Sequence, residues 1–290
     1  MNTVPMRTVL LIAGAALLVP VALAAGPKKG DAPSGGPIAK APSACGSKIL
    51  PLSEGNEWTY TPIAAPQAAI DQIARISPTP AASIVITVKS IDAKKGADTV
   101  VTLEEKISVD LNKDLKKPPQ LDTHTVTSTI TCNAKKFEIS PNSFFFAGEP
   151  GGYFNLELDK IERPKGTTWQ LTNGSIGDAE WREDLVAHWS RTPTPNSEAK
   201  LGAGKLELER RFTPQQPEKI ITKLASYTAE KLGLITTGRV TLENPQAPDA
   251  KPFELPAGWV SQVWLVENVG VVQTLNTYAH MYQLSDAKLK

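Results

Sequence analysis

His-Thr-Val-Thr-Ser-Thr-Ile-Thr-Cys, at residues 124–132, has threonine at every odd position. The even positions include Val126, Ile130 and Cys132, so one side of the segment is polar and the other is largely apolar. Alternation with a period of two is typical of a β-strand that covers a core with one face. The segment therefore predicts a strand of an antiparallel sheet, with Cys132 on its buried side.

The same alternation recurs on both sides of this segment. It is clear at 84–89 and at 101–109, where aliphatic residues share one face. Further strands are predicted at 135–139, 153–161, 204–212, 219–228, 234–243, 258–267 and 270–284. Helical spacing is confined to 66–77 and 178–189, and the second of these fits a strand equally well. We expect a mainly β protein of curved antiparallel sheets, with one or two short helices.

A short internal sequence similarity divides the chain into two parts. The blocks Ile49–Tyr60 and Ile161–Leu171 both contain an apolar residue, a proline, a glycine and then a tryptophan, and each leads into a run of strands. Two similar β halves, 49–150 and 151–290, are the expected organisation. Residues 25–48 are rich in Gly, Pro and Ala, which favours a flexible linker before the first half.

The first 24 residues have the pattern of an export signal. Arg7 precedes an apolar run at 8–19, Pro20 ends the run, and Ala22-Leu23-Ala24 matches a small-x-small cleavage site. We expect removal of 1–24 and a periplasmic or extracellular protein that does not span the membrane afterwards. A retained membrane anchor is the alternative, because the apolar run nearly reaches spanning length.

The two cysteines, Cys45 and Cys132, are expected to form a disulfide. Export brings the chain into an oxidising compartment, and the sequence holds no third cysteine that could compete. Lipidation at Cys45 is a weaker alternative. Cys45 lies far beyond the apolar run, and the large aliphatic residue expected before the small pair is missing.

Charge and residue types argue against several function classes. The chain has 31 basic and 30 acidic residues, and no basic stripe that would bind nucleic acid stands out. His124, His188 and His280 are far apart in the sequence and show no metal-ligand spacing. We therefore predict no cofactor, no metal site and no nucleic-acid partner.

Catalytic motifs are equally weak. Asn173-Gly174-Ser175-Ile176-Gly177 approaches the nucleophile elbow of a hydrolase, but the chain lacks the βαβ alternation that this motif needs, so a polar turn is favoured. Paired carboxylates are interpreted as solvated: Glu104 and Glu105, Glu183 and Asp184, Glu207 and Glu209. No catalytic residue is assigned, and a hydrolase is the least favoured function class.

The C-terminal segment is the most informative for function. Residues 258–267 and 270–282 predict a hairpin around a tight turn at Asn268-Val269. The facing pairs would be Trp259 with Tyr278, Val263 with Thr274, and Leu265 with Val272. Because both faces carry large apolar groups, the hairpin is either covered on both sides or lines an apolar groove. The candidate ligand-contacting residues are Trp259, Trp264, Tyr278, His280 and Tyr282.

Two motifs at the ends of the expected mature chain carry a family resemblance. They are Pro51-Leu52-x-x-Gly55-Asn56-x-Trp58-x-Tyr60 and Trp264-Leu265-Val266-x-x-Val269-Gly270-Val271-Val272. The chain resembles a loose class of uncharacterised exported bacterial β-rich proteins with an N-terminal "PLxxGNxWxY" block and a C-terminal "WLxxxVGxV" hairpin. The resemblance implies a curved antiparallel sheet and an envelope location, and no activity. Val-Glu-Asn-Val stands before Gly270 where Ala-Pro-Gly-Val is common, which leaves the form of the turn open.

The favoured function is a non-catalytic β-sheet module of the bacterial envelope. It would bind a hydrophobic small molecule or an envelope protein through a sheet face or edge. The alternative is a structural or assembly component that pairs with another chain through an edge strand.

Overall fold

The computed structural model describes the following residues: 35–70, 79–93, 98–112, 117–133, 136–147, 158–164, 176, 179–189, 203–242, 253–276 and 278–290. The expected export signal, Ser175 and the boundary at 150 between the expected halves lie outside these ranges. The short helices are η1 (Ala44–Gly46), α1 (Gln67–Ile70) and α2 (Phe144–Ala147).

The described residues form twelve strands of a single sheet, in which every neighbouring pair is antiparallel. The strands are β1 (Glu57–Ile63), β2 (Ser83–Ala93), β3 (Thr99–Asp110), β4 (Leu121–Asn133), β5 (Lys136–Ile139), β6 (Lys160–Glu162), β7 (Trp181–Trp189), β8 (Gly204–Ile221), β9 (Ser226–Leu242), β10 (Phe253–Val266), β11 (Gly270–Leu275) and β12 (Met281–Lys288). The mainly β class predicted from the alternation is confirmed.

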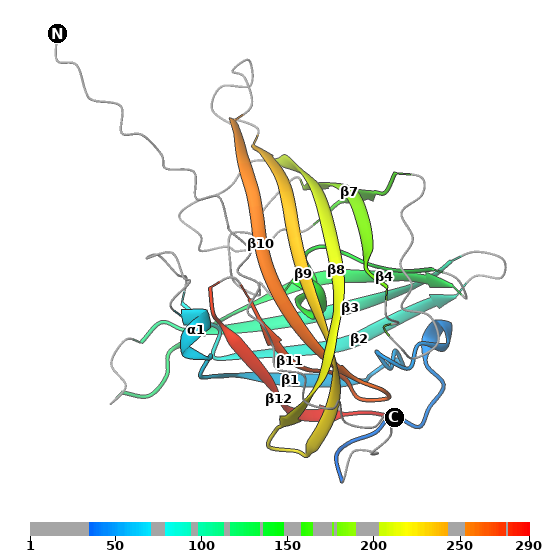
Figure 1. Cartoon of the computed structure of the whole chain (residues 1–290), viewed down its shortest axis with the longest axis vertical. Coiled ribbons are helices and arrows are strands. Elements are labelled where there is room, and N and C mark those ends of the chain that lie inside the picture. Colours follow the sequence, from blue (N-terminus) through cyan, green and yellow to red (C-terminus); the bar gives the residue numbers. More distant parts are fainter. Residues whose placement is uncertain are drawn as a thin grey trace.

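The strand order brings the first and last strands to the middle of the sheet. It runs β5-β4-β3-β2-β1-β12-β11-β10-β9-β8-β7-β6, so β1 pairs with β12 and the short strands β5 and β6 form the edges. In Figure 1 the long strands β7–β10 stand upright as an arm that crosses the direction of β1–β4. The sheet therefore turns its inner face onto itself, and the main core fills the space between the two parts.

The two sequence motifs are in direct contact within this core. Trp58 Nε1 donates a hydrogen bond to the carbonyl of Val269 at 2.7 Å, and Tyr60 Oη donates to the carbonyl of Val271 at 2.8 Å. Buried Asn56 accepts a hydrogen bond from the Lys290 amide at 3.0 Å. Side chains of the first motif thus satisfy backbone carbonyls of the second motif, more than 200 residues away.

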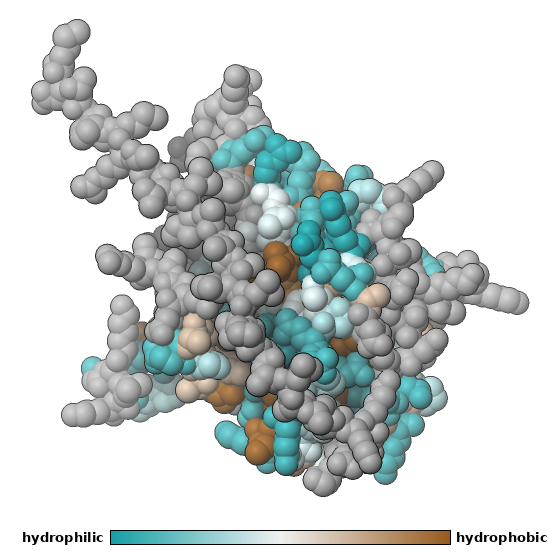
Figure 2. All heavy atoms as spheres, viewed as in Figure 1, coloured by the Kyte–Doolittle hydropathy of each residue, from teal (hydrophilic) through white to brown (hydrophobic). Residues whose placement is uncertain are grey.

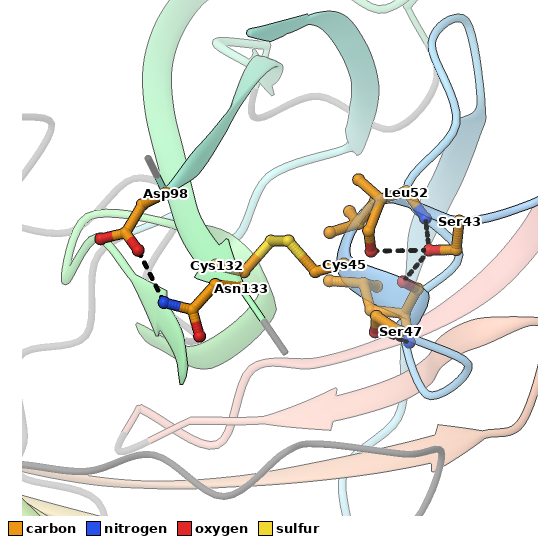
Figure 3. Close-up of a disulfide and its surroundings, with 9 residues drawn as sticks. Ser43, Cys45, Ser47, Leu52, Asp98, Cys132 and Asn133 are labelled. Carbon is orange, nitrogen blue, oxygen red and sulfur yellow. Dashed lines mark hydrogen bonds between the residues drawn. A yellow bond between two sulfur atoms is a disulfide. The ribbon is translucent and has the colours of Figure 1, made fainter. Parts of the chain in front are cut away.

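Residues 35–48, expected as part of a flexible linker, instead pack against the sheet. The Ala39 amide donates to the carbonyl of Asn268 at 2.8 Å, and the Asn268 amide donates to the carbonyl of Lys48 at 2.7 Å. Cys45 and Cys132 are joined through sulfurs 2.07 Å apart, which ties η1 to β4 (Figure 3). Ordered chain therefore begins before Ile49, because hydrogen bonds and the disulfide supply the contacts that the Gly- and Pro-rich composition lacks.

Several predicted elements have different bounds in the structure. Residues 181–189 form a strand, which settles the helix-or-strand ambiguity there. Residues 204–221 form one long strand with a bulge between Gln215 and Glu218, where two strands were expected. The expected strand 270–284 divides into β11 and β12, which are joined by residues 276–280.

Glu105 is a buried carboxylate that fastens α2 to the sheet. It accepts hydrogen bonds from Ser128 Oγ at 2.6 Å, Ser143 Oγ at 2.7 Å and the Phe144 amide at 2.8 Å. Burial raises the pKa of the Glu105 carboxyl, although these hydrogen bonds act in the opposite direction. The contact holds Phe144 against Tyr60, with ring centroids 4.8 Å apart, so α2 closes part of the main core.

Candidate functional site

The terminal hairpin is covered on its inner face and, around Trp264, on its outer face as well, whereas Val260 on the outer face is 52% exposed. On the inner face Val263 and Leu265 lie in the main core. On the outer face Trp264 Nε1 donates to Glu218 Oε2 at 2.8 Å, and Lys231 lies over its ring at 4.9 Å. Trp264 therefore packs inside the protein and does not line an open groove.

Three of the other four candidate ligand contacts, Tyr278, His280 and Tyr282, lie next to one another. Tyr282 is buried, accepts a hydrogen bond from the Ala81 amide at 2.9 Å and packs edge-on against Phe144. Tyr278 and His280 are half-buried next to it, with their rings 5.9 Å apart. Trp259 pairs through its backbone with Thr236, not with Tyr278, and its side chain lies outside the described part of the chain. The structure thus separates Trp264 from the Tyr278–Tyr282 group.

A belt of buried charges crosses the inner face of the arm. Glu183 on β7 and Arg210 on β8 face each other across the ladder, with exposures of 0% and 1%, and their side chains bond at 2.9 Å. Burial lowers the pKa of the Arg210 guanidinium, and the Glu183 carboxylate opposes this by raising it. The interpretation of Glu183 and Glu105 as solvated carboxylates is therefore wrong, because both point into the molecule.

Arg163 extends this belt to the sheet edges. Its Nε donates to Glu183 Oε1 at 2.8 Å, and its Nη2 donates to the carbonyl of Ile139 at 3.1 Å. Arg210 Nη2 donates to the same carbonyl at 3.0 Å. Arg163 follows β6 and Ile139 ends β5, so arginine side chains join the two edges of the open sheet.

Beyond the belt the inner face of the arm becomes entirely apolar. We call this surface the arm face; its members form a second buried cluster apart from the main core: Leu185, Ala187, Trp189, Leu206, Leu208 and Val240. Cross-strand rows connect them, since Leu185 pairs with Leu208 and Ala187 pairs with Leu206. Partly buried Leu158, Ile161 and Leu242 pack at its margin.

Gly204 and the backbone pairing of β10 with β9 lie at the margin of the arm face. The Trp189 ring occupies the place where a Cβ at residue 204 would lie, so this position requires glycine. On β10 the residues Leu255 and Phe253 pair with Val240 and Leu242, so apolar residue types continue at these register positions. Three rows, each two residues apart, extend for roughly 13 Å along the strands.

The opposite face of the arm is largely polar, apart from the paired residues Ile235 and Val260, which are 45% and 52% exposed. Glu207 pairs with Arg239, and Arg182 forms an ion pair with Glu209 at 2.9 Å. In Figure 2 the described residues on the visible face are mainly hydrophilic, and hydrophobic ones occur in small separate groups. The arm is thus an amphipathic sheet whose apolar side faces inward.

No group of three or more His, Cys, Asp or Glu side chains in the described ranges could hold a metal ion. Within those ranges the structure also contains no helix with the length and hydrophobicity needed to cross a membrane. The buried carboxylate of Glu105 accepts hydrogen bonds from serine and backbone donors, and that of Glu183 pairs with arginine. Both carboxylates therefore connect elements of the fold.

Comparison with known proteins identifies remote structural likenesses. No protein-family model and no curated protein matches the chain. A protein of Bacteroides fragilis NCTC 9343, described as exported and as having a YmcC-like fold, aligns with a TM-score of 0.42 and 12% identity over 83% of this chain and 99% of that one. A protein of Parabacteroides distasonis ATCC 8503, described as a lipoprotein, aligns with a TM-score of 0.39 and 11% identity over the same shares. At this distance neither likeness carries an argument about function.

Proposed function

We propose that the protein is an exported, non-catalytic module of the bacterial envelope that holds a lipid-like molecule against the arm face. The export pattern at 1–24 and the Cys45–Cys132 disulfide support a location outside the cytoplasm. The resemblance of the two terminal motifs to exported β-rich proteins agrees with this location.

The observation that carries the proposal is the second apolar cluster. A sheet needs an apolar face where it covers a core, and the main core of this molecule ends at the charged belt of Glu183 and Arg210. The arm continues past the belt with Leu206, Leu208 and Val240 on the same side. We take this apolar surface, which is set apart from the main core, as the surface that the ligand contacts.

Pairing through a sheet edge, the alternative function, is less well supported. The edge strands β5 and β6 span four and three residues. The Ile139 carbonyl at the end of β5 already accepts hydrogen bonds from Arg163 and Arg210. Short, side-chain-capped edges are devices that oppose strand addition.

Binding of N-phenyl-1-naphthylamine, which fluoresces in apolar surroundings, tests the proposal. Val240→Thr places a hydroxyl on the arm face with little change in volume, and should weaken binding at least roughly five-fold. Val186→Thr is the matched control, because Val186 is half-buried on the outer face of β7. Absence of binding by the unmodified protein, or equal affinities for the two variants, would show that the cluster is only a second core.

A further inference from the structure

The two edges of the sheet meet without a backbone ladder in the described part of the chain. β5 pairs with β4 over four residues and β6 pairs with β7 over three, but no pairing joins β5 to β6 among the described strands. The Ile139 carbonyl at the end of β5 instead accepts hydrogen bonds from Arg163 at 3.1 Å and from Arg210 at 3.0 Å. We call this junction the seam; its described members are Glu138, Ile139, Arg163, Glu183 and Arg210.

The seam separates the two apolar clusters of the molecule. Ile139 belongs to the main core, whereas Ile161, which precedes Arg163 by two residues, packs at the margin of the arm face. Ile161 also pairs with Ala187, an arm-face residue with an exposure of 0%. If β5 and β6 part at the seam, water therefore reaches the arm face beside Ala187, while main-core residues far from the seam stay covered.

The seam is built from charged side chains that are largely removed from water. Arg163 bonds to Glu183 at 2.8 Å and lies 3.6 Å from Glu138, and the four charged side chains of the seam are at most 13% exposed. Burial of such ions is unfavourable, and their mutual attraction offsets this only in part. When the seam parts, the ions regain water, which lowers the free energy of opening. A junction of apolar side chains would instead be opposed by the hydrophobic effect.

We propose that the seam is a gate: β5 and β6 part reversibly in the folded protein and expose the arm face beside Ala187. The short edge strands favour this motion, because strands with few ladder hydrogen bonds open locally more readily than the centre of a sheet. The inference goes beyond the proposed function, since the seam can open whether or not a ligand binds to the arm face.

Labelling of single buried thiols with N-ethylmaleimide tests the gate. Ala187→Cys places a thiol on the arm face, and Ala229→Cys places one in the main core, also at an exposure of 0%. Ala229 lies on β9 and pairs with Glu218, which is eight residues beyond Arg210 on β8. The native cysteines are joined in the disulfide and do not react. The thiol at position 187 should be labelled at least about ten-fold faster than the thiol at position 229, because local opening requires less free energy than global unfolding.

Two substitutions distinguish opening at the seam from unfolding of the whole sheet. Arg163→Met removes seam contacts that opening breaks, and should speed labelling at position 187 about ten-fold, as expected for lost hydrogen bonds to charged groups. Tyr60→Phe removes the 2.8 Å hydrogen bond to the Val271 carbonyl in the centre of the sheet, which stays intact when the seam opens. It should speed labelling at position 229 and leave labelling at position 187 unchanged.

Arg182→Met is the matched control for the loss of an arginine, because Arg182 is exposed on the outer face of β7; it should change neither rate. If Tyr60→Phe speeds labelling at both positions alike, position 187 reacts only through global unfolding and the gate is overturned. If Arg163→Met leaves the rate at position 187 unchanged, the opening does not occur at the seam and the inference is equally overturned. The proposed function is tested separately, by binding of N-phenyl-1-naphthylamine.

Discussion

At the scale of single residues, Gly238 marks the closest approach of two strands in the arm. A Cβ at this position would meet the carbonyl oxygen of Glu207 and would lie 3.0 Å from the Cα of Leu208. Both are backbone atoms, which cannot move aside as the end of a side chain can. On the next strand a Cβ at Gly258 would have its nearest contact, the Thr236 carbonyl oxygen, at 3.8 Å.

Gly238→Ala should therefore lower the free energy of unfolding by about 1–3 kcal/mol. Gly258→Ala should change it by less than about 0.5 kcal/mol. Urea denaturation of the two variants and the unmodified protein measures both values. Equal effects at the two positions would contradict the close approach of β8 and β9.

Glu105 gives the stability a defined pH dependence. Because burial raises the pKa of its carboxyl in the folded state above the ordinary value of 4.5, folding favours the protonated form. The resulting stabilisation is present below the unfolded-state pKa and is lost as the pH rises through the folded-state pKa. Glu105→Gln cannot titrate, so its stability relative to the unmodified protein should rise as the pH increases above the ordinary carboxyl pKa of 4.5. If the denaturation midpoints of Glu105→Gln and of the unmodified protein change in parallel with pH, Glu105 does not titrate as a buried carboxyl.

At the scale of elements, the charged belt joins β7 and β8 to the sheet edges. Two arginines, Arg163 and Arg210, contact the buried Glu183 carboxylate, and Arg210→Met would remove one of them. We expect a loss of about 3 kcal/mol or more in the free energy of unfolding. Arg211→Met is the control: Arg211 is the next residue, is about half exposed and forms only long ion pairs, at 3.6 and 3.8 Å, so the loss should stay below about 0.5 kcal/mol. Similar losses in thermal or chemical unfolding would mean that the belt is not a stabilising junction.

The sequence contains a signal for these buried charges that the interpretation of paired carboxylates overlooked. Glu183 has the same parity as Leu185, Ala187 and Trp189, and Arg210 has the same parity as Leu206, Leu208 and Phe212. Alternation therefore already placed both on the apolar face of their strands. The pairing of acidic residues in the sequence suggested solvated side chains, but the position of each residue within its strand determines whether its side chain is buried.

The hairpin shows where prediction from sequence ends. Val263 does face Thr274, but Leu265 faces Val271 and not Val272, because a bulge lies between Trp264 and Leu265. The turn consists of residues 267–269, and Asn268 within it has a φ of 60°. Gly270, the first residue of β11, has a φ of 100°. The cover over Trp264 comes from Glu218, which is 46 residues away in the chain, and periodicity carries no information about such contacts.

At the scale of the whole molecule, the central pairing of β1 with β12 joins the first and last strands of the sheet. Local patterning identified most strands, but it could not indicate that the first and last of them are neighbours. The described strands belong to one continuous sheet, and the division into two similar halves stays a prediction. Contacts of Trp58 and Tyr60 with Val269 and Val271 hold its centre together.

The disulfide adds a second long-range connection, across a separation of 87 residues. Replacing both cysteines with serine should lower the free energy of unfolding by roughly 4 kcal/mol in the chain-entropy model. Denaturation with and without reductant measures the effect in the unmodified protein, and the variant should show no response to reductant. A thiol assay that finds two reactive thiols in the unfolded, unreduced protein would rule out the bond.

The central claim, that the arm face holds a lipid-like molecule, is tested most directly by native mass spectrometry of the protein purified from its own envelope. We expect a mature chain that begins after Ala24 and carries one bound lipid-like molecule, which Val240→Thr largely loses. A chain whose mass is accounted for by protein alone, in preparations that retain other envelope lipids, would contradict the account.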